Sequence, residues 1–94
     1  MTLDLSEEGK RPYFLWDEDL SVRQLREKLS AGDRGQWRYY AAKIMREARY
    51  EDVWKFLSLK DVSESWDSLR PILGRQRAFW EFLISVWKRH GIVS

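Results

Sequence analysis

The longest regular pattern of apolar positions along the chain lies between residues 33 and 49. Apolar side chains recur there every three or four residues, and basic side chains lie between them. Because a period of 3.6 residues gathers such positions on one arc, the pattern predicts an amphipathic helix that begins at Asp33 or Gly35 and ends near Arg49. The apolar arc consists of Trp37, Tyr40, Ala41, Ile44, Met45 and Ala48.

A shorter helix is predicted just before it, over residues 21–31. Ser21 and Gln24 have the spacing of a capping box, in which each side chain binds a backbone N–H group of the other residue. Gly32 is suited to the left-handed conformation that commonly follows a helix. The apolar stripe of this helix consists of Val22, Leu25 and Leu29.

Three further helices are predicted in the second half of the chain. A short one covers residues 50–57, and the next begins after Ser58 and is stopped by Pro71. The last helix covers residues 74–90 and is followed by Gly91, a second candidate for the left-handed conformation.

The N-terminal part of the chain lacks a helical period. Residues 1–10 are expected to form a flexible arm, and Pro12 favours an extended backbone at the residue before it. The four bulky side chains of residues 13–16 suit a buried irregular segment or a short strand equally well. The sequence therefore predicts an all-α domain over residues 11–94. We expect a compact bundle of four to five helices with a short extended N-terminal segment.

Composition narrows the possible functions. The 94 residues include no Cys and one His, which excludes disulfides, thiol nucleophiles and thiolate metal sites. Seventeen basic and 15 acidic side chains give a net charge of +2, far from the imbalance of a polyelectrolyte binder. No nucleophile, metal or phosphate-loop motif occurs, so we expect neither catalysis nor a cofactor. No apolar segment resembles a secretory signal or a membrane span, and the expected location is the cytoplasm.

The densest acidic cluster consists of Asp17, Glu18 and Asp19. A divalent cation would need further oxygen ligands, and the spacing does not match a calcium loop. The cluster could instead contact a protein partner, or it could simply favour the start of the following helix electrostatically.

A basic stripe on the predicted helix of residues 33–49 is the candidate nucleic-acid surface. Arginine and lysine side chains could neutralise phosphates, and the adjacent Tyr39 could stack on a base. Glu47 interrupts the stripe, which could equally be a solvated helix face or contact an acidic protein. The stripe consists of Arg38, Lys43, Arg46 and Arg49.

The last helix carries the strongest binding signal, since its apolar arc covers more than half of the circumference. One flank contains Phe79, Phe82 and Val86, and the other contains Trp80, Ile84 and Trp87. Such a helix is either wholly in the core, or one flank binds a partner or a second copy of the chain. Tryptophan is frequent in binding hot spots, so the flank of Trp80, Ile84 and Trp87 is predicted to stay partly exposed as the partner-binding surface.

Three sequence blocks resemble a known family. RPYFLWDEDLS at residues 11–21, ARYEDVWKFLSLKDV at 48–62 and RAFWEFLISVW at 77–87 are similar to a family of small uncharacterised bacterial proteins. The genes of that family often lie beside those of abortive-infection-type nucleotidyltransferase toxins. The matching positions are Tyr13, Phe14, Trp16, Asp17 and Asp19 in the first motif and Tyr50, Asp52, Val53 and Trp54 in the second.

The resemblance implies a toxin-neutralising or accessory role. The prediction is accordingly a non-catalytic protein-binding module, antitoxin-like, whose acidic cluster or apolar flank covers the toxin and obstructs access of its substrate. The alternative is a small nucleic-acid-binding protein that uses the basic stripe. Trp16 and Trp54 are expected to be buried structural anchors in either case.

Overall fold

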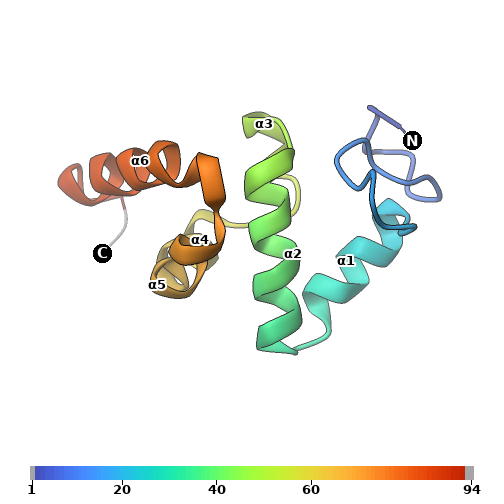
Figure 1. Ribbon diagram of the computed structural model, residues 1–94, viewed down its shortest axis with the longest axis horizontal. Coiled ribbons are helices and arrows are strands. Elements are labelled where there is room, and N and C mark those ends of the chain that lie inside the picture. The colour runs from blue at the N-terminus through green and yellow to red at the C-terminus, as the bar shows by residue number, and fades with distance from the viewer. Residues whose placement is uncertain (1, 93–94) are drawn as a thin grey trace. The chain divides into compact units, whose positions relative to one another are not determined.

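Every regular element of the described chain, residues 2–92 of a computed structural model, is helical (Figure 1). The predicted all-α fold class is confirmed. The helices are α1 (Val22–Ser30), α2 (Arg34–Glu47), α3 (Tyr50–Val53), α4 (Leu59–Glu64), α5 (Trp66–Leu69) and α6 (Arg77–Arg89), with two 3₁₀-helices, η1 (Arg70–Ile72) and η2 (Gly74–Gln76). Within residues 2–92, no helix has the length and apolar character needed to span a membrane.

The chain divides into two units, and α2 begins in the first and ends in the second. The first unit extends to Tyr40 and the second starts at Ala41. The sequence predicts one domain after the N-terminal arm.

In the first unit, α1 begins with the predicted capping box. The Gln24 N–H group donates to the Ser21 hydroxyl at 3.1 Å, and the Gln24 side chain accepts from the Ser21 N–H group at 2.9 Å. Val22 and Leu25 are buried, and Gly32 follows the helix with a φ of +85°. The predicted start and end of this helix are therefore confirmed.

Removal of this cap should lower the stability of the fold measurably. Ser21→Ala is expected to lower the free energy of unfolding by about 1 kcal/mol, since loss of an N-cap side chain leaves a first-turn N–H group without its acceptor. Urea denaturation measures the change. Ser30→Ala is the matched control, because its hydroxyl only donates to the Arg26 carbonyl at the other end of the helix. Equal destabilisation by the two variants would contradict a capping role for Ser21.

Residues 2–10 also contribute to the start of α1. The N–H groups of Val22 and Arg23, in the first turn, donate to the carbonyls of Lys10 and Glu8 at 2.9 and 3.0 Å. First-turn N–H groups have no acceptor inside a helix, so these two carbonyls supply the acceptors that the first turn of α1 lacks. Leu5 is buried as well. Residues 2–10 thus make specific contacts with the start of α1, while the flexibility of the arm stays a prediction.

The apolar run at residues 13–16 forms successive turns rather than a strand. The Leu15 N–H group donates to the Pro12 carbonyl at 3.1 Å, and Phe14 and Leu15 are buried. Because the turns direct consecutive side chains differently, Trp16 points outward and is 64% exposed. The prediction that Trp16 is a buried anchor is wrong.

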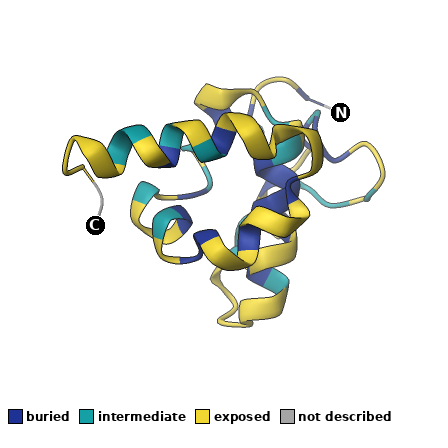
Figure 2. Cartoon of the chain, turned by 60° about the vertical axis from the view of Figure 1, so that its left-hand side comes forward, coloured by how far each residue is buried: buried dark blue, intermediate teal, exposed yellow. Residues whose placement is uncertain are grey.

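At the start of α2, the Gln36 N–H group donates to the Asp33 carboxylate at 3.0 Å, so Asp33 is the residue that precedes the helix. In the second unit, the positions of α2 from Ala41 to Met45 are all buried. Figure 2 draws these buried positions in dark blue. The predicted apolar arc of this helix is confirmed as core at Ala41, Ile44 and Met45.

Two of the predicted helices are shorter than expected. The helix after Arg49 ends at Val53, and the one after Ser58 is interrupted at Ser65, where α4 gives way to α5. The Ser65 carbonyl accepts from the Ser68 hydroxyl at 3.0 Å as well as from backbone N–H groups, and such local bonds compete with the regular helix pattern. The predicted caps at Ser58 and Gly91 are confirmed: Ser58 accepts from the Asp61 N–H group, and Gly91 has a φ of +71°.

Candidate functional site

The predicted binding flank of α6 is mostly core. Trp80 and Ile84 are only 1% and 2% exposed, and Trp87 is partly covered with its ring 5.8 Å from that of Trp54. The prediction that this flank stays exposed is therefore wrong for Trp80 and Ile84. The apolar arc of α6 is wide enough for either flank to face the core. The flank with the two tryptophans is the one that packs into the core of the second unit.

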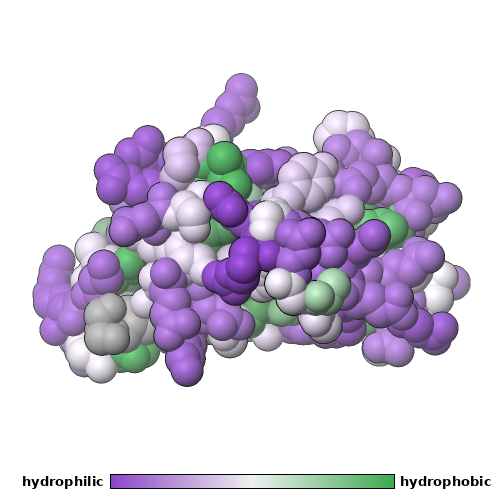
Figure 3. Space-filling model, turned by 90° about the horizontal axis from the view of Figure 1, so that it is seen from below, coloured by the Kyte–Doolittle hydropathy of each residue, from purple (hydrophilic) through white to green (hydrophobic). Residues whose placement is uncertain are grey.

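The opposite flank of α6 is the one that reaches solvent. Phe79 is 45% exposed and Phe82 is 63% exposed, and residues three positions apart are neighbours on a helix surface. On the face drawn in Figure 3, hydrophilic side chains predominate and apolar areas are small and separate. Two adjacent exposed phenylalanines are thus a feature that the packing of the second unit does not explain.

Phe79 belongs to a cluster of five aromatic rings, together with Tyr50, Trp54, Trp80 and Trp87. Its ring centroid lies 5.4 Å from that of Trp80 and 5.9 Å from that of Tyr50, both nearly perpendicular. Trp54 continues the cluster at 5.8 Å from Tyr50, Trp80 and Trp87. Tyr50 is also exposed. The cluster therefore has a buried end at Trp80 and an exposed edge at Tyr50 and Phe79, and Phe82 extends that edge along α6.

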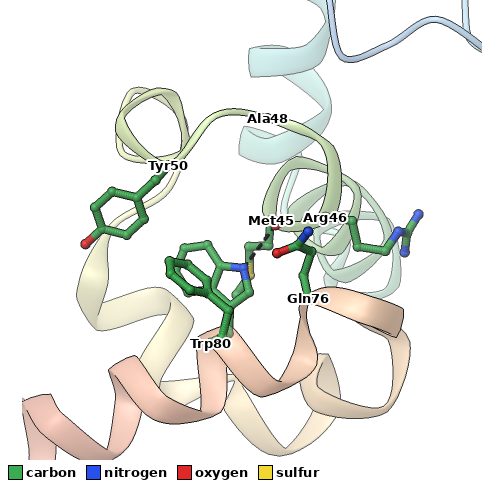
Figure 4. Close-up of a pocket in the computed structure, with 7 residues that line it drawn as sticks. Met45, Arg46, Ala48, Tyr50, Gln76 and Trp80 are labelled. Atoms are coloured by element: carbon green, nitrogen blue, oxygen red, sulfur yellow. Dashed lines mark hydrogen bonds between the residues drawn. The ribbon is translucent and has the colours of Figure 1, made fainter.

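The buried end of the cluster is fixed by a hydrogen bond. The indole Nε1–H of Trp80 donates to the Met45 carbonyl at 3.0 Å (Figure 4). Met45 lies in the last turn of α2, where carbonyl groups generally need partners outside the helix. This bond connects α6 to α2 within the second unit and holds the ring cluster in one orientation.

The short helix that carries Tyr50 contains a buried carboxylate with two ion pairs. Asp52 is buried, and its carboxylate lies 3.0 Å from Lys55 Nζ and 3.5 Å from Arg49 Nε. A four-residue helix is unstable in isolation, so such contacts are needed to hold α3 in place. The burial of Asp52 was not predicted from the sequence.

A hollow of about 180 Å³ opens beside the exposed edge of the rings. We call it the aromatic hollow. Figure 4 shows Tyr50 and Trp80 on one side of it and the side chain of Arg46 directed away from both rings. Its lining consists of Met45, Arg46, Ala48, Tyr50, Gln76, Phe79 and Trp80.

A second open hollow, of about 420 Å³, shares Arg46 and Gln76 with the first. We call it the arginine hollow. The Arg46 guanidinium donates to the Ile72 carbonyl at 2.8 Å, which fixes that side chain. Arg75 makes no hydrogen bond or ion pair with any residue that the structure describes. The lining consists of Arg46, Glu47, Leu73, Arg75 and Gln76.

The predicted acidic cluster lies in the first unit and does not act as one group. Glu18 accepts hydrogen bonds from the hydroxyls of Tyr39 and Tyr40 at 3.0 and 2.9 Å, while Asp17 and Asp19 are exposed. Within residues 2–92, no three acidic or histidine side chains are grouped so that they could hold a metal ion. Glu18 therefore has a structural role in joining its segment to α2.

The basic stripe is not a continuous cationic surface. Lys43 is only 4% exposed, and Arg49 is paired with Asp52. Arg46 binds the Ile72 carbonyl, while Arg38 lies exposed on the part of α2 that belongs to the first unit. Lys43 therefore does not belong to an exposed basic stripe, because its helix position falls within the buried stretch from Ala41 to Met45.

The protein is thus a small all-α protein with two hollows beside an exposed aromatic surface. This aromatic surface consists of Tyr50, Phe79 and Phe82. No protein-family model matches the chain, and no curated protein or solved structure is significantly similar to it. The resemblance drawn from the three sequence blocks therefore stays a prediction.

Proposed function

We propose that the protein is a non-catalytic protein-binding module whose binding surface consists of Tyr50, Phe79 and Phe82. The observation that carries the proposal is the exposure of Phe79 and Phe82 at 45% and 63% beside the ring cluster. Burial of a large apolar side chain contributes about 1.5–3 kcal/mol, so covering these rings would favour association. Exposed apolar patches of this kind mark partner-binding surfaces on soluble proteins.

The anchoring of the cluster supports the same function. Phe79 and Tyr50 contact Trp80, which is itself held by the Met45 carbonyl. Side chains that are already ordered lose little conformational entropy on binding, which leaves more of the contact energy for affinity. Aromatic residues next to a hollow are also typical of binding hot spots.

The resemblance to the small bacterial family adds a specific partner to this proposal, a nucleotidyltransferase-type toxin. In this form of the proposal, the aromatic surface covers the toxin and obstructs the access of its substrate. The exposed Asp17 and Asp19 of the first unit are candidate additional contacts.

Site-specific photo-crosslinking tests the surface in the cells that naturally produce the chain. A benzoylphenylalanine replaces Phe82, an exposed aromatic side chain, and is expected to form an adduct with one protein partner that mass spectrometry then identifies. The same residue at Leu3, which is 68% exposed in the first unit, is the control and should form no such adduct. Phe79→Lys, added to the Phe82 probe, is expected to abolish the adduct.

The proposal is contradicted by equal adducts from the two positions, or by an adduct that survives Phe79→Lys. An adduct with a second copy of the chain alone would replace the proposed partner by self-association. A thermal melt of the Phe79→Lys variant is part of the test, because loss of the adduct counts only where the fold is retained. If that variant unfolds, Phe79→Ser takes its place.

A further inference from the structure

The two hollows beside the aromatic surface differ in chemistry and are adjacent. The exposed rings of the aromatic hollow are those of Tyr50 and Phe79, since Met45 and Trp80 are only 2% and 1% exposed. The arginine hollow offers two guanidinium groups against the single carboxylate of Glu47. Arg46 and Gln76 line both. Because the two hollows share these residues, one bound segment can reach both.

The cations of the arginine hollow are not neutralised locally. Arg46 uses one of its guanidinium donors on the Ile72 carbonyl and has others left, since arginine carries five N–H donors. Arg75 is unpaired among the described residues, and Glu47 makes no ion pair with it although both line the hollow. Guanidinium groups bind carboxylates with two parallel hydrogen bonds, whereas they repel a cationic ligand.

We infer that the occupant of this surface is an acidic peptide segment of a protein partner, with an apolar side chain in the aromatic hollow and a carboxylate in the arginine hollow. This inference rests on the proposed function and adds the chemistry of the partner to it. Alternate side chains of an extended segment lie on the same side, so an aromatic residue and a glutamate two positions later would reach the two hollows. The Gln76 side chain, between the hollows, can bind the backbone of the segment.

NMR titration of the full ¹⁵N-labelled chain with short peptides tests the inference. The probe is a capped pentapeptide of sequence Gly-Phe-Ser-Glu-Gly, and the comparison peptides replace Glu by Gln or Phe by Ala. The probe is expected to shift the Trp80 indole N–H and the Arg75 Nε–H resonances at millimolar concentration. The Gln peptide should bind about fivefold more weakly, as expected for one exposed charge pair.

Two matched charge variants show whether the arginine hollow causes the preference for the Glu peptide over the Gln peptide. Arg75→Gln is expected to remove the preference for Glu over Gln, while the binding of the Phe side chain persists. Arg89→Gln makes the same change of charge at an exposed position of α6 that lines neither hollow, and it should retain the preference. A similar loss in both variants would overturn the inference, because it would indicate attraction by overall charge alone.

The inference is also overturned if the Glu and Gln peptides bind equally, or if no peptide shifts these resonances. An oligothymidylate that shifts them at lower concentration than the Glu peptide would assign the hollows to nucleic acid instead. Photo-crosslinking at Phe82 does not depend on the charge of the partner. An adduct with a segment that lacks acidic residues would therefore retain the proposed function and overturn only this inference.

Discussion

Trp80→Ala is expected to lower the free energy of unfolding by about 3–5 kcal/mol, the usual cost of truncating a buried tryptophan. The side chain is 1% exposed, and its ring contacts those of Tyr50, Trp54 and Phe79. Its removal would leave a cavity at the centre of the ring cluster. Small domains have a total stability of about 5–15 kcal/mol, so this loss is a large part of what the chain has.

The hydrogen bond to Met45 adds a polar component that a second variant separates. Trp80→Phe retains much of the packing but removes the indole donor, which leaves the Met45 carbonyl without this partner. The expected cost of the lost bond is about 1 kcal/mol. A loss in Trp80→Phe as large as that in Trp80→Ala would show that the bond, rather than the packing, dominates.

Urea denaturation of both variants measures these changes, with Phe82→Ala as the control on the same helix. Phe82 is mostly exposed, so its truncation is expected to change the free energy of unfolding by about 0.5 kcal/mol or less. If Phe82→Ala is as destabilising as Trp80→Ala, the burial assigned to the two flanks of α6 is wrong, and so is the proposed binding surface.

The features that sequence reasoning predicted correctly have partners nearby in the chain. Ser21 caps α1 by a bond to a residue three positions away, and Ser58 does the same for α4. Gly32 and Gly91 adopt the left-handed conformation because the chain must leave a helix at those points. Such interactions depend on local spacing alone, which is why the pattern of residues suffices to find them.

The orientation of α6 depends instead on a distant contact. Phe79 and Trp80 are adjacent in an apolar arc, and nothing in their spacing distinguishes the buried side from the exposed one. The difference arises because Trp80 reaches the Met45 carbonyl, 35 residues earlier in the chain. The sequence therefore identified α6 as a helix with a wide apolar arc, but it could not show which flank of that arc is buried.

The burial of the charged residues Lys43 and Asp52 was also missed. Lys43 belongs to the basic stripe by its sequence position, but it lies in a stretch of α2 in which every residue is buried. Asp52 is buried and forms ion pairs with Arg49 and Lys55. Helical periodicity identifies the apolar face of a helix, which packs against the core. It does not show how far neighbouring segments extend around that helix.

Phe14→Ala is expected to cost about 3–5 kcal/mol, whereas Trp16→Ala should cost about 0.5 kcal/mol or less. Phe14 is 2% exposed, and its ring lies edge-to-face at 5.2 Å from that of Tyr13. Trp16 is the larger side chain, but 64% of it is already in contact with solvent. Its truncation therefore exposes little new apolar surface and leaves no internal cavity.

The comparison tests the turn structure of residues 13–16, because the two side chains are two positions apart. An alternating strand would place both on the same face and make both truncations costly or both mild. The turns that begin at Pro12 separate them, so urea denaturation should give a difference of at least about 2 kcal/mol. Equal losses would favour the strand, and a larger loss for Trp16→Ala would restore that tryptophan as the anchor of the first unit.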